Sequence, residues 1–190
     1  MKPEKAAGSM IKGFFGHFKT VAKHRRLVRR NCFKCGIPLQ GLKHDLSKYS
    51  PTEFIAGCRY FTGTHSPNEG ERLEKGYSAA WLHHKGRNKH HFEYWNDVDL
   101  ETKKYVPVKM PYRYLAEMLC DRVAASRVYK GKDYTNSSAL EYFMHGHGRE
   151  QMHPETAKEL EKLLTMIKDE GEDAAFAYVK KKLKSGDVDY

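Results

Sequence analysis

The sequence has no long apolar run, and this absence excludes a protein that crosses a membrane as a helix. No window of the 190 residues comes near eighteen consecutive apolar positions, the length that a transmembrane helix needs. The first ten residues, MKPEKAAGSM, also lack the apolar segment and small-residue cleavage site of a secretory signal. We therefore expect a cytoplasmic protein with no membrane partner.

Cysteine is scarce as well, with four residues in the chain. In a reducing compartment so few thiols need not pair. Cys32 and Cys35 have the spacing of one zinc knuckle, but a structural zinc site usually needs two such pairs, and the sequence contains no second one. We interpret the cysteines as free buried thiols: Cys32, Cys35, Cys58 and Cys120.

Alternation of apolar and polar residues, the mark of a strand, is nearly absent, and helical spacing takes its place. Ser50, Pro51 and Glu53 supply an N-cap, a first-turn proline and an acidic N3 residue, which together predict a helix start. We expect further helices over about 11–28, 77–95 with a break at Gly86, 112–129, 157–168 and up to about 184. Residues 63–76, rich in Gly, Pro, Asn and Ser, are predicted to be a long loop, and residues 97–111 to be irregular.

These elements predict an all-α fold, a single bundle of six to eight helices formed by residues 1–190. Its core is expected over about 10–130, with a C-terminal helical extension over about 135–185. The formal net charge is +10, and eleven histidines add to it. A basic balance favours anionic partners such as phosphorylated metabolites or nucleic acid, although most of the charge is dispersed over solvated helix faces.

The dipeptide His44-Asp45 is the most informative feature of the sequence. It places an imidazole and a carboxylate, two kinds of metal ligand, at neighbouring positions. Neighbouring side chains of a helix diverge by about 100 degrees, so both can reach one centre only near a helix end. The dipeptide alone is common, and its interpretation as half of a metal site depends on what else the chain supplies.

Other candidate ligands lie before and after this dipeptide. His17 and His24 are seven residues apart on the first predicted helix, and His17 is interpreted as structural or supporting. Asp121 has an apolar context, and a carboxylate buried there must be paired or bind a metal. If 77–95 were one helix, His84, Asn88 and His91 would share a face, and His83 and His90 another.

This order of ligands resembles the HD-domain superfamily of metal-dependent phosphohydrolases. The resemblance covers about 14–129, and it implies that His24, His44, Asp45 and Asp121 bind a metal. In the binuclear branch of that superfamily a separate histidine and a His-His pair complete a second site, which here implies His84 (or His83) with His90 and His91. The cofactor implied is one or two divalent ions, manganese, iron or another transition metal.

Two short motifs extend the resemblance. The first, His44-Asp45-Leu46-Ser47-Lys48, is similar to the His-Asp-x-Gly-Lys motif of the cyclic-dinucleotide phosphodiesterase members, whose lysine contacts phosphate. The second, His90-His91-Phe92-Glu93, is similar to the His-His-x-Glu motif of the same members. Ser47 stands in place of the glycine and no Gly-Tyr-Pro element follows, so cyclic dinucleotides are not the predicted substrate. The whole chain looks closer still to an uncharacterised bacterial and phage family of unknown function.

The chemistry expected from this set is hydrolysis of a small phosphate ester, such as a nucleotide. A metal pair would lower the pKa of a bound water, and basic side chains would contact the phosphate. Candidate substrate-binding residues are Lys48, Arg87, Asn88 and Arg122. Candidate catalytic residues are Lys48, with Glu93 and Glu117 to orient water or to hold a ligand histidine.

Two other functions remain open from the sequence. An HD-type di-iron oxygenase would use the same ligand order, and the phosphate-binding lysine and arginines favour hydrolysis over it. A non-enzymatic protein that binds nucleotides or nucleic acid would use the basic charge, and its binding would weaken steeply with salt. The chain contains no recognised nucleic-acid-binding motif, which places this last.

Overall fold

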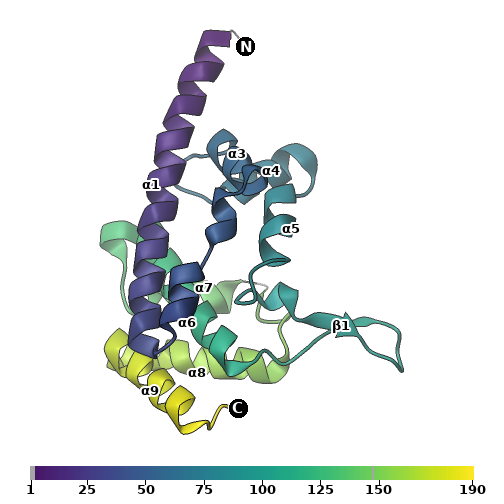
Figure 1. Cartoon of the computed structure of the whole chain (residues 1–190), viewed down its shortest axis with the longest axis vertical. Helices are drawn as coiled ribbons and strands as arrows, with labels where there is room; N and C mark the ends of the chain where they lie inside the picture. The colour runs from purple at the N-terminus through teal and green to yellow at the C-terminus, as the bar shows by residue number, and fades with distance from the viewer. Residues whose placement is uncertain (1–2, 147) are drawn as a thin grey trace.

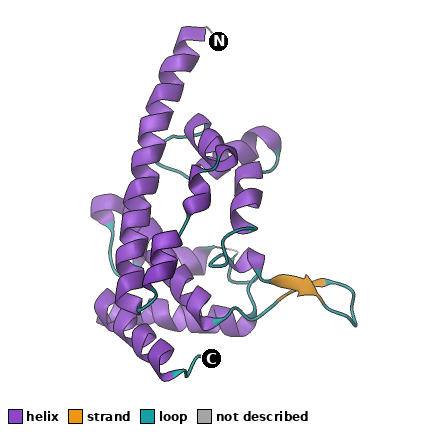
Figure 2. Ribbon diagram, in the orientation of Figure 1, coloured by secondary structure: helices purple, strands orange, loops and turns teal. Residues whose placement is uncertain are grey.

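The computed structural model of the chain describes residues 3–146 and 148–190. The described part is mainly helical (Figure 2), which confirms the all-α prediction. It contains nine α-helices rather than six to eight: α1 (Pro3–Cys35), α2 (Pro38–Lys43), α3 (Pro51–Arg59), α4 (Pro67–Lys75), α5 (Ala79–Lys85), α6 (Tyr112–Lys130), α7 (Ser138–His145), α8 (Pro154–Glu170) and α9 (Glu172–Ser185). Three short 3₁₀ turns lie between them: η1 (Leu46–Tyr49), η2 (Phe92–Tyr94) and η3 (Gly131–Asp133).

Most of the predicted helix ends are confirmed. The Ser50 hydroxyl accepts a hydrogen bond from the backbone N–H of Glu53 at the start of α3, as an N-cap does. Helix α6 ends before Gly131, which has a positive φ, and Gly171 separates α8 from α9. The sequence signals at helix ends were therefore reliable where a cap residue and an apolar stripe occurred together.

The predicted loop over 63–76 is wrong, because it contains α4. Pro67 occupies the first turn, where its missing N–H costs nothing, and Glu69 adds an acidic residue to that turn. Gly76 ends the helix in the left-handed conformation that glycine adopts without strain. The residues that suggested a loop thus lie at the caps and in the first turn of a short helix.

The segment predicted to be irregular contains a small hairpin. Strand β1 (Asn96–Val98) pairs antiparallel with β2 (Tyr105–Pro107), with Asp97 opposite Val106. It projects from the helical body (Figure 1). Each strand has three residues, too few for a period of two to be visible in the sequence.

The core is built around α6, which packs against α1, α7, α8 and α9. Leu115, Leu119 and Val123 of α6 are fully buried, and shortening such a residue to alanine costs about 2–5 kcal/mol. The apolar stripe of α8 and the buried side chains Phe176 and Val179 of α9 enter the same core. Residues after 135 thus share the core with the N-terminal helices.

The four cysteines are free and buried, as predicted. The Sγ atoms of Cys35 and Cys120 lie 3.5 Å apart, too far for a disulfide. No described helix has an apolar stretch long enough to cross a bilayer.

Candidate metal centre

The His44-Asp45 dipeptide lies at the end of a short helix. Helix α2 ends at Lys43, and Asp45 has a φ of 54°, in the left-handed region, before η1 begins. Aspartate enters this region more readily than most residues. The change of backbone direction between His44 and Asp45 allows both side chains to point at one centre, which two successive residues inside a helix could not do.

Helix α1 holds this segment in place. Helix α2 passes so close to α1 that a Cβ atom on Gly41 would lie 2.6 Å from the Cβ of Cys32. Arg25 of α1 donates from Nε to the carbonyl of His44 (2.8 Å) and from Nη2 to the carbonyl of Leu42 (3.1 Å). The backbone of the metal-ligand candidates is therefore anchored on the longest helix.

One group of donors, which we call the outer set, consists of His24, His44, Asp45 and Asp121. The Nε2 atom of His24 lies 2.9 Å from Oδ1 of Asp121, and Nε2 of His44 lies 3.4 Å from Oδ2 of Asp45. The His24 and Asp121 side chains keep 12% and 18% of their surface exposed. Solvent and small molecules can therefore reach this side of the centre.

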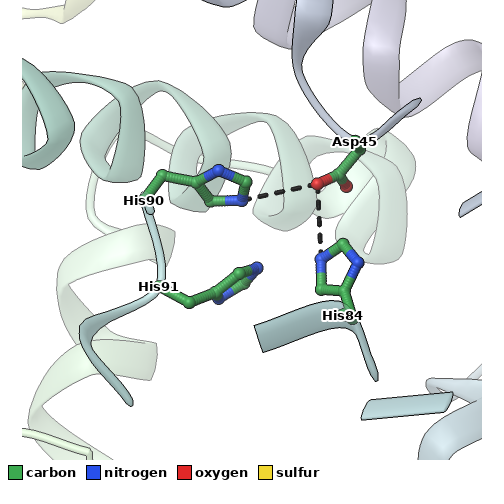
Figure 3. Close-up of side chains that lie close together, drawn as sticks. All are labelled: Asp45, His84, His90 and His91. Carbon is green, nitrogen blue, oxygen red and sulfur yellow. Dashed lines mark ion pairs between the residues drawn. The ribbon is translucent and has the colours of Figure 1, made fainter. Parts of the chain in front are cut away.

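A second group, the inner set, consists of Asp45, His84, His90 and His91. The Nε2 atoms of His84 and His90 lie 3.3 and 3.4 Å from Oδ1 of Asp45, and the three histidine rings surround this oxygen (Figure 3). The ring centroid of His91 is 4.2 Å from that of His90 and 4.8 Å from that of His84. The rings of His84 and His90 are almost completely buried.

The two sets share Asp45, whose Oδ2 faces the outer set and whose Oδ1 faces the inner set. Among the described residues, Asp45 Oδ1, His90 Nε2 and His91 Nε2 are buried without a hydrogen-bond partner, although the first two are within ion-pair distance of each other. Buried polar atoms left unpaired cost free energy, and several at one place favour a bound ion. The donors present therefore fit a divalent metal on each side of Asp45.

Glu117 of α6 supports both sets from behind. Its Oε1 lies 3.0 Å from Nδ1 of His44 and 3.2 Å from Nδ1 of His90. Burial would raise the pKa of Glu117, but the hydrogen bonds from His44 and His90 lower it to about 2, so the carboxylate is ionised. Because it binds the Nδ1 atoms and leaves both Nε2 atoms facing Asp45, Glu117 orients two imidazoles, one from each set.

Glu53 of α3 supports the inner set, and the sequence analysis did not identify it. Its two oxygens lie 2.7 Å from Nδ1 of His84 and 2.7 Å from Nδ1 of His83. In the sequence, Glu53 was interpreted only as the acidic residue three positions after the N-cap Ser50. This interpretation gave no reason to expect that its side chain would contact His83 and His84. The only signal was the burial expected for an acidic residue on the apolar side of α3.

The same contacts separate His83 from His84. His84 directs Nε2 at Asp45, whereas His83 ends at Glu53 and belongs to neither donor set. Helix α5 ends at Lys85, which confirms the break predicted at Gly86. The face that one continuous helix would give His84, Asn88 and His91 therefore does not form, and His90 and His91 lie in the loop before η2. The loop brings both members of the pair to Asp45, which one continuous helix would not.

Proton occupancy differs between His44 of the outer set and His91 of the inner set. Burial would lower the pKa of His44, but Asp45 and the hydrogen bonds to Asp121 and Glu117 raise it to about 10. Burial and the neighbouring His90 and His84 hold the pKa of His91 well below its usual value. The His91 imidazole is therefore neutral and offers a lone pair, whereas His44 must lose a proton when it binds a metal.

Lys48 and Asn88 contact the centre without belonging to a donor set. Lys48 Nζ lies 3.5 Å from Oδ2 of Asp45 and is partly exposed. Burial would lower the pKa of Lys48, but Asp45 and Asp121 raise it, so the ammonium stays charged. Asn88 donates to the Ser47 hydroxyl (2.9 Å) and to the backbone carbonyl of His84 (2.8 Å), so it positions His84 instead of facing solvent for a substrate.

Three predicted residues belong to neither donor set. Arg87 is exposed and donates to the carbonyl of His83. Arg122 follows Asp121, stacks its guanidinium over the Phe143 ring at 5.4 Å and has a buried Nε without a partner. Burial raises the pKa of Glu93, whose Oε2 is also buried and unpaired within the described residues.

Comparison with known proteins identifies the family of the chain. Residues 13–166, which include every donor described above, match the profile of a family of unknown function (DUF5662). The chain belongs to this family. No curated protein and no solved structure matches it.

The family assignment agrees with the sequence-based resemblance to a family of unknown function, and it supplies no activity. Nothing in the comparisons links DUF5662 to the HD-domain superfamily. The argument for function therefore depends on the metal centre alone.

Proposed function

We propose that this DUF5662 protein is a phosphohydrolase of the HD-domain type, which uses divalent transition metals to hydrolyse a small phosphate ester such as a nucleotide. The proposal depends mainly on one observation. Asp45 is buried between two donor sets, and each of its oxygens faces a different set. A carboxylate in this position could serve two cations, one with each donor set, and two-metal sites would supply the charge stabilisation that in-line phosphoryl transfer needs.

The donor types indicate which metal would bind. His24, His44, Asp45 and Asp121 would hold one ion, and Asp45, His84, His90 and His91 the other. Mixed imidazole and carboxylate ligands suit manganese, iron and other transition metals, whereas magnesium prefers oxygen ligands and water. When bound, such ions act as Lewis acids for phosphoryl oxygens and lower the pKa of water.

The remaining side chains would bind and orient the substrate. His24, Asp121 and Lys48 form the partly exposed side of the centre, so we place the phosphate there. Lys48 stays protonated and would neutralise charge on the phosphate. Arg122 is the second cation that we assign to the substrate, because its buried Nε has no partner among the described residues.

Hydrolysis is preferred over the alternative oxygenase because of Lys48. An oxygenase centre needs no fixed cation beside its bridging carboxylate, whereas a phosphate dianion does. Glu117 contacts His44 and His90, which supports the second of the two roles predicted for it, holding a ligand histidine. Asn88, predicted to bind substrate, donates to the backbone carbonyl of His84. We assign both residues positioning roles. We assign no role to Arg87.

The test compares metal content and hydrolysis in wild-type protein and in Asp45→Asn, with Asp187→Asn as the matched surface control. Protein purified without chelator is expected to carry two transition-metal ions per chain and to hydrolyse members of a panel of phosphate esters. Asp45→Asn should lose both ions and the activity, and Asp187→Asn should keep them. Two bound irons with oxygen consumption but no hydrolysis would favour the oxygenase, and no bound metal after reconstitution would overturn both readings.

A further inference from the structure

The N-terminal half of α1 extends beyond the rest of the molecule (Figure 1) and exposes large apolar side chains. Ile11 is 61% exposed and Phe15 is 66% exposed, and Phe14 and Phe18 are also exposed. Their spacing of three and four residues places all four on one side of the helix, which we call the α1 apolar face. Exposed apolar residues gathered in one place, unlike scattered ones, mark an interaction surface.

The apolar face continues from α1 onto its neighbours. The Phe14 ring packs edge-on against the Phe54 ring, with 5.4 Å between the ring centroids, and the Phe18 and Tyr49 ring centroids are 6.2 Å apart. Ile55 of α3 is 62% exposed. The surface is therefore held by η1 and α3 and has a fixed shape, rather than belonging to a lone helix that could turn its apolar side elsewhere.

A second feature of α1 is its charge. Residues 10–35 contain eight lysines and arginines and no aspartate or glutamate, so most of the net charge of +10 lies on this helix. Five of these cations follow a helical spacing next to the apolar face and are exposed, and we call them the α1 basic face: Lys12, Lys19, Lys23, Arg26 and Arg30.

We propose that α1 docks on an anionic phospholipid surface through its apolar and basic faces. The apolar face would insert among the acyl chains at the interface, and the basic face would contact the phosphate headgroups, as in helices that lie on a membrane without crossing it. The expectation of no membrane partner arose from the lack of a spanning segment, which does not concern this kind of binding. The proposal is independent of the metal centre.

The two faces together favour this occupant over others. Nucleic acid would pair with the basic face but would leave the phenylalanines in water. A second copy of the chain would cover the apolar face, but it would bring two strongly basic helices together without acidic partners. A phospholipid surface has anionic headgroups next to apolar acyl chains, so it matches the basic face and the apolar face at once.

The experiment measures co-sedimentation of the full chain with phosphatidylcholine vesicles, with and without phosphatidylserine. Binding is expected only when phosphatidylserine is present, and it should fall as salt rises. Absence of binding to the phosphatidylserine vesicles would overturn the proposal.

Two pairs of variants distinguish specific binding through the two faces of α1 from nonspecific hydrophobic or electrostatic attraction. Phe15→Ser with Phe18→Ser should reduce binding at least about tenfold, whereas Leu73→Ser with Leu100→Ser, at more exposed positions elsewhere, should not. The triple change of Lys12, Lys19 and Lys23 to Gln should also reduce it at least about tenfold. The same change at Lys180, Lys181 and Lys184 of α9 should leave it unchanged.

Each variant must first show the helicity and melting temperature of the wild type. Equal losses in the α1 and α9 triple variants would mean nonspecific attraction and would contradict the proposal. Light scattering provides the remaining check. If the wild type is a dimer that does not bind vesicles, and the double change Phe15→Ser with Phe18→Ser dissociates it, the apolar face belongs to a second copy of the chain. If the protein binds an acidic protein but not vesicles, the face belongs to that partner.

Discussion

The outer and inner donor sets have one residue in common and differ in almost everything else. The outer set has two carboxylates and two imidazoles and is partly open to solvent, whereas the inner set has three imidazoles and one carboxylate oxygen and is largely closed. The open set is suited to meet a substrate, and the closed one to hold an ion. If both sets bind an ion, as we propose, the difference between them would let the outer site exchange its ligands with a substrate while the inner site retains its ion.

The largest effect should come from removing one ligand that belongs to a single set. Asp121→Asn should release the outer ion and keep the inner one, and His91→Ala should do the reverse, because neither residue is shared. Each change should reduce hydrolysis by about a thousandfold, since a catalytic metal contributes several kcal/mol and each tenfold in rate corresponds to about 1.4 kcal/mol. Metal analysis of both variants gives the stoichiometry. If either loses both ions, the sets are not separable.

A smaller effect is expected from the two supporting carboxylates, and here the sets should respond unequally. Glu117→Gln should weaken both sites, because Glu117 contacts His44 and His90, while Glu53→Gln should weaken the inner site only. Loss of a residue that orients a metal ligand typically costs about 10–100-fold in metal affinity. Competition with a chelator, with the exposed Glu74→Gln as control, measures both affinities. Equal weakening in both variants would contradict the division into sets.

Lys48 tests whether the open side of the centre serves the substrate. Lys48→Met should keep both ions and reduce kcat/KM for a phosphate ester by about 10–100-fold, since a hydrogen bond to a charged group contributes about 1.5–3 kcal/mol. Lys48→Arg should restore part of the activity because it restores the charge. Steady-state kinetics on metal-loaded protein measures this. A change in metal content would mean instead that Lys48 serves the ions.

The smallest effect concerns the backbone on which both sets depend. Arg25→Met removes two hydrogen bonds to carbonyls at the end of α2, and it should lower the free energy of unfolding by about 1–2 kcal/mol. Metal stoichiometry should not change, because no donor is lost. Urea unfolding of the metal-free protein, with Arg26→Met as control, is the measurement. Loss of metal at unchanged stability would show that Arg25 acts on the donors directly.

Much of the centre could be predicted from the sequence, because each ligand has a chemical type that is costly to bury without a partner. Asp121 was identified in this way, and His44 and Asp45 were identified as neighbouring imidazole and carboxylate donors. His84 could not be separated from His83, since the argument from helical faces fails when the helix ends at Lys85. Glu53 could not be found because local capping already explained it.

The helices also differed in how well the sequence predicted them. Long helices such as α6 and α8 were predicted because their apolar spacing extends over several turns. Helix α4 and the hairpin were not, because a nine-residue helix of polar composition and strands of three residues carry too little periodicity. Their formation depends on caps and on contacts with distant residues. The sequence shows each of these residues singly and does not show which of them come into contact.

The left-handed backbone of Asp45 limits what evolution can place at that position. Asparagine is the one other residue that enters this region comparably well with a side chain of the same size, but it lacks the charge that two cations need. Glutamate has the charge, yet it must accept a conformation that it disfavours and a longer reach. In a scan of all substitutions scored separately for folding and for metal content, position 45 should therefore tolerate asparagine in the first assay and nothing but aspartate in the second.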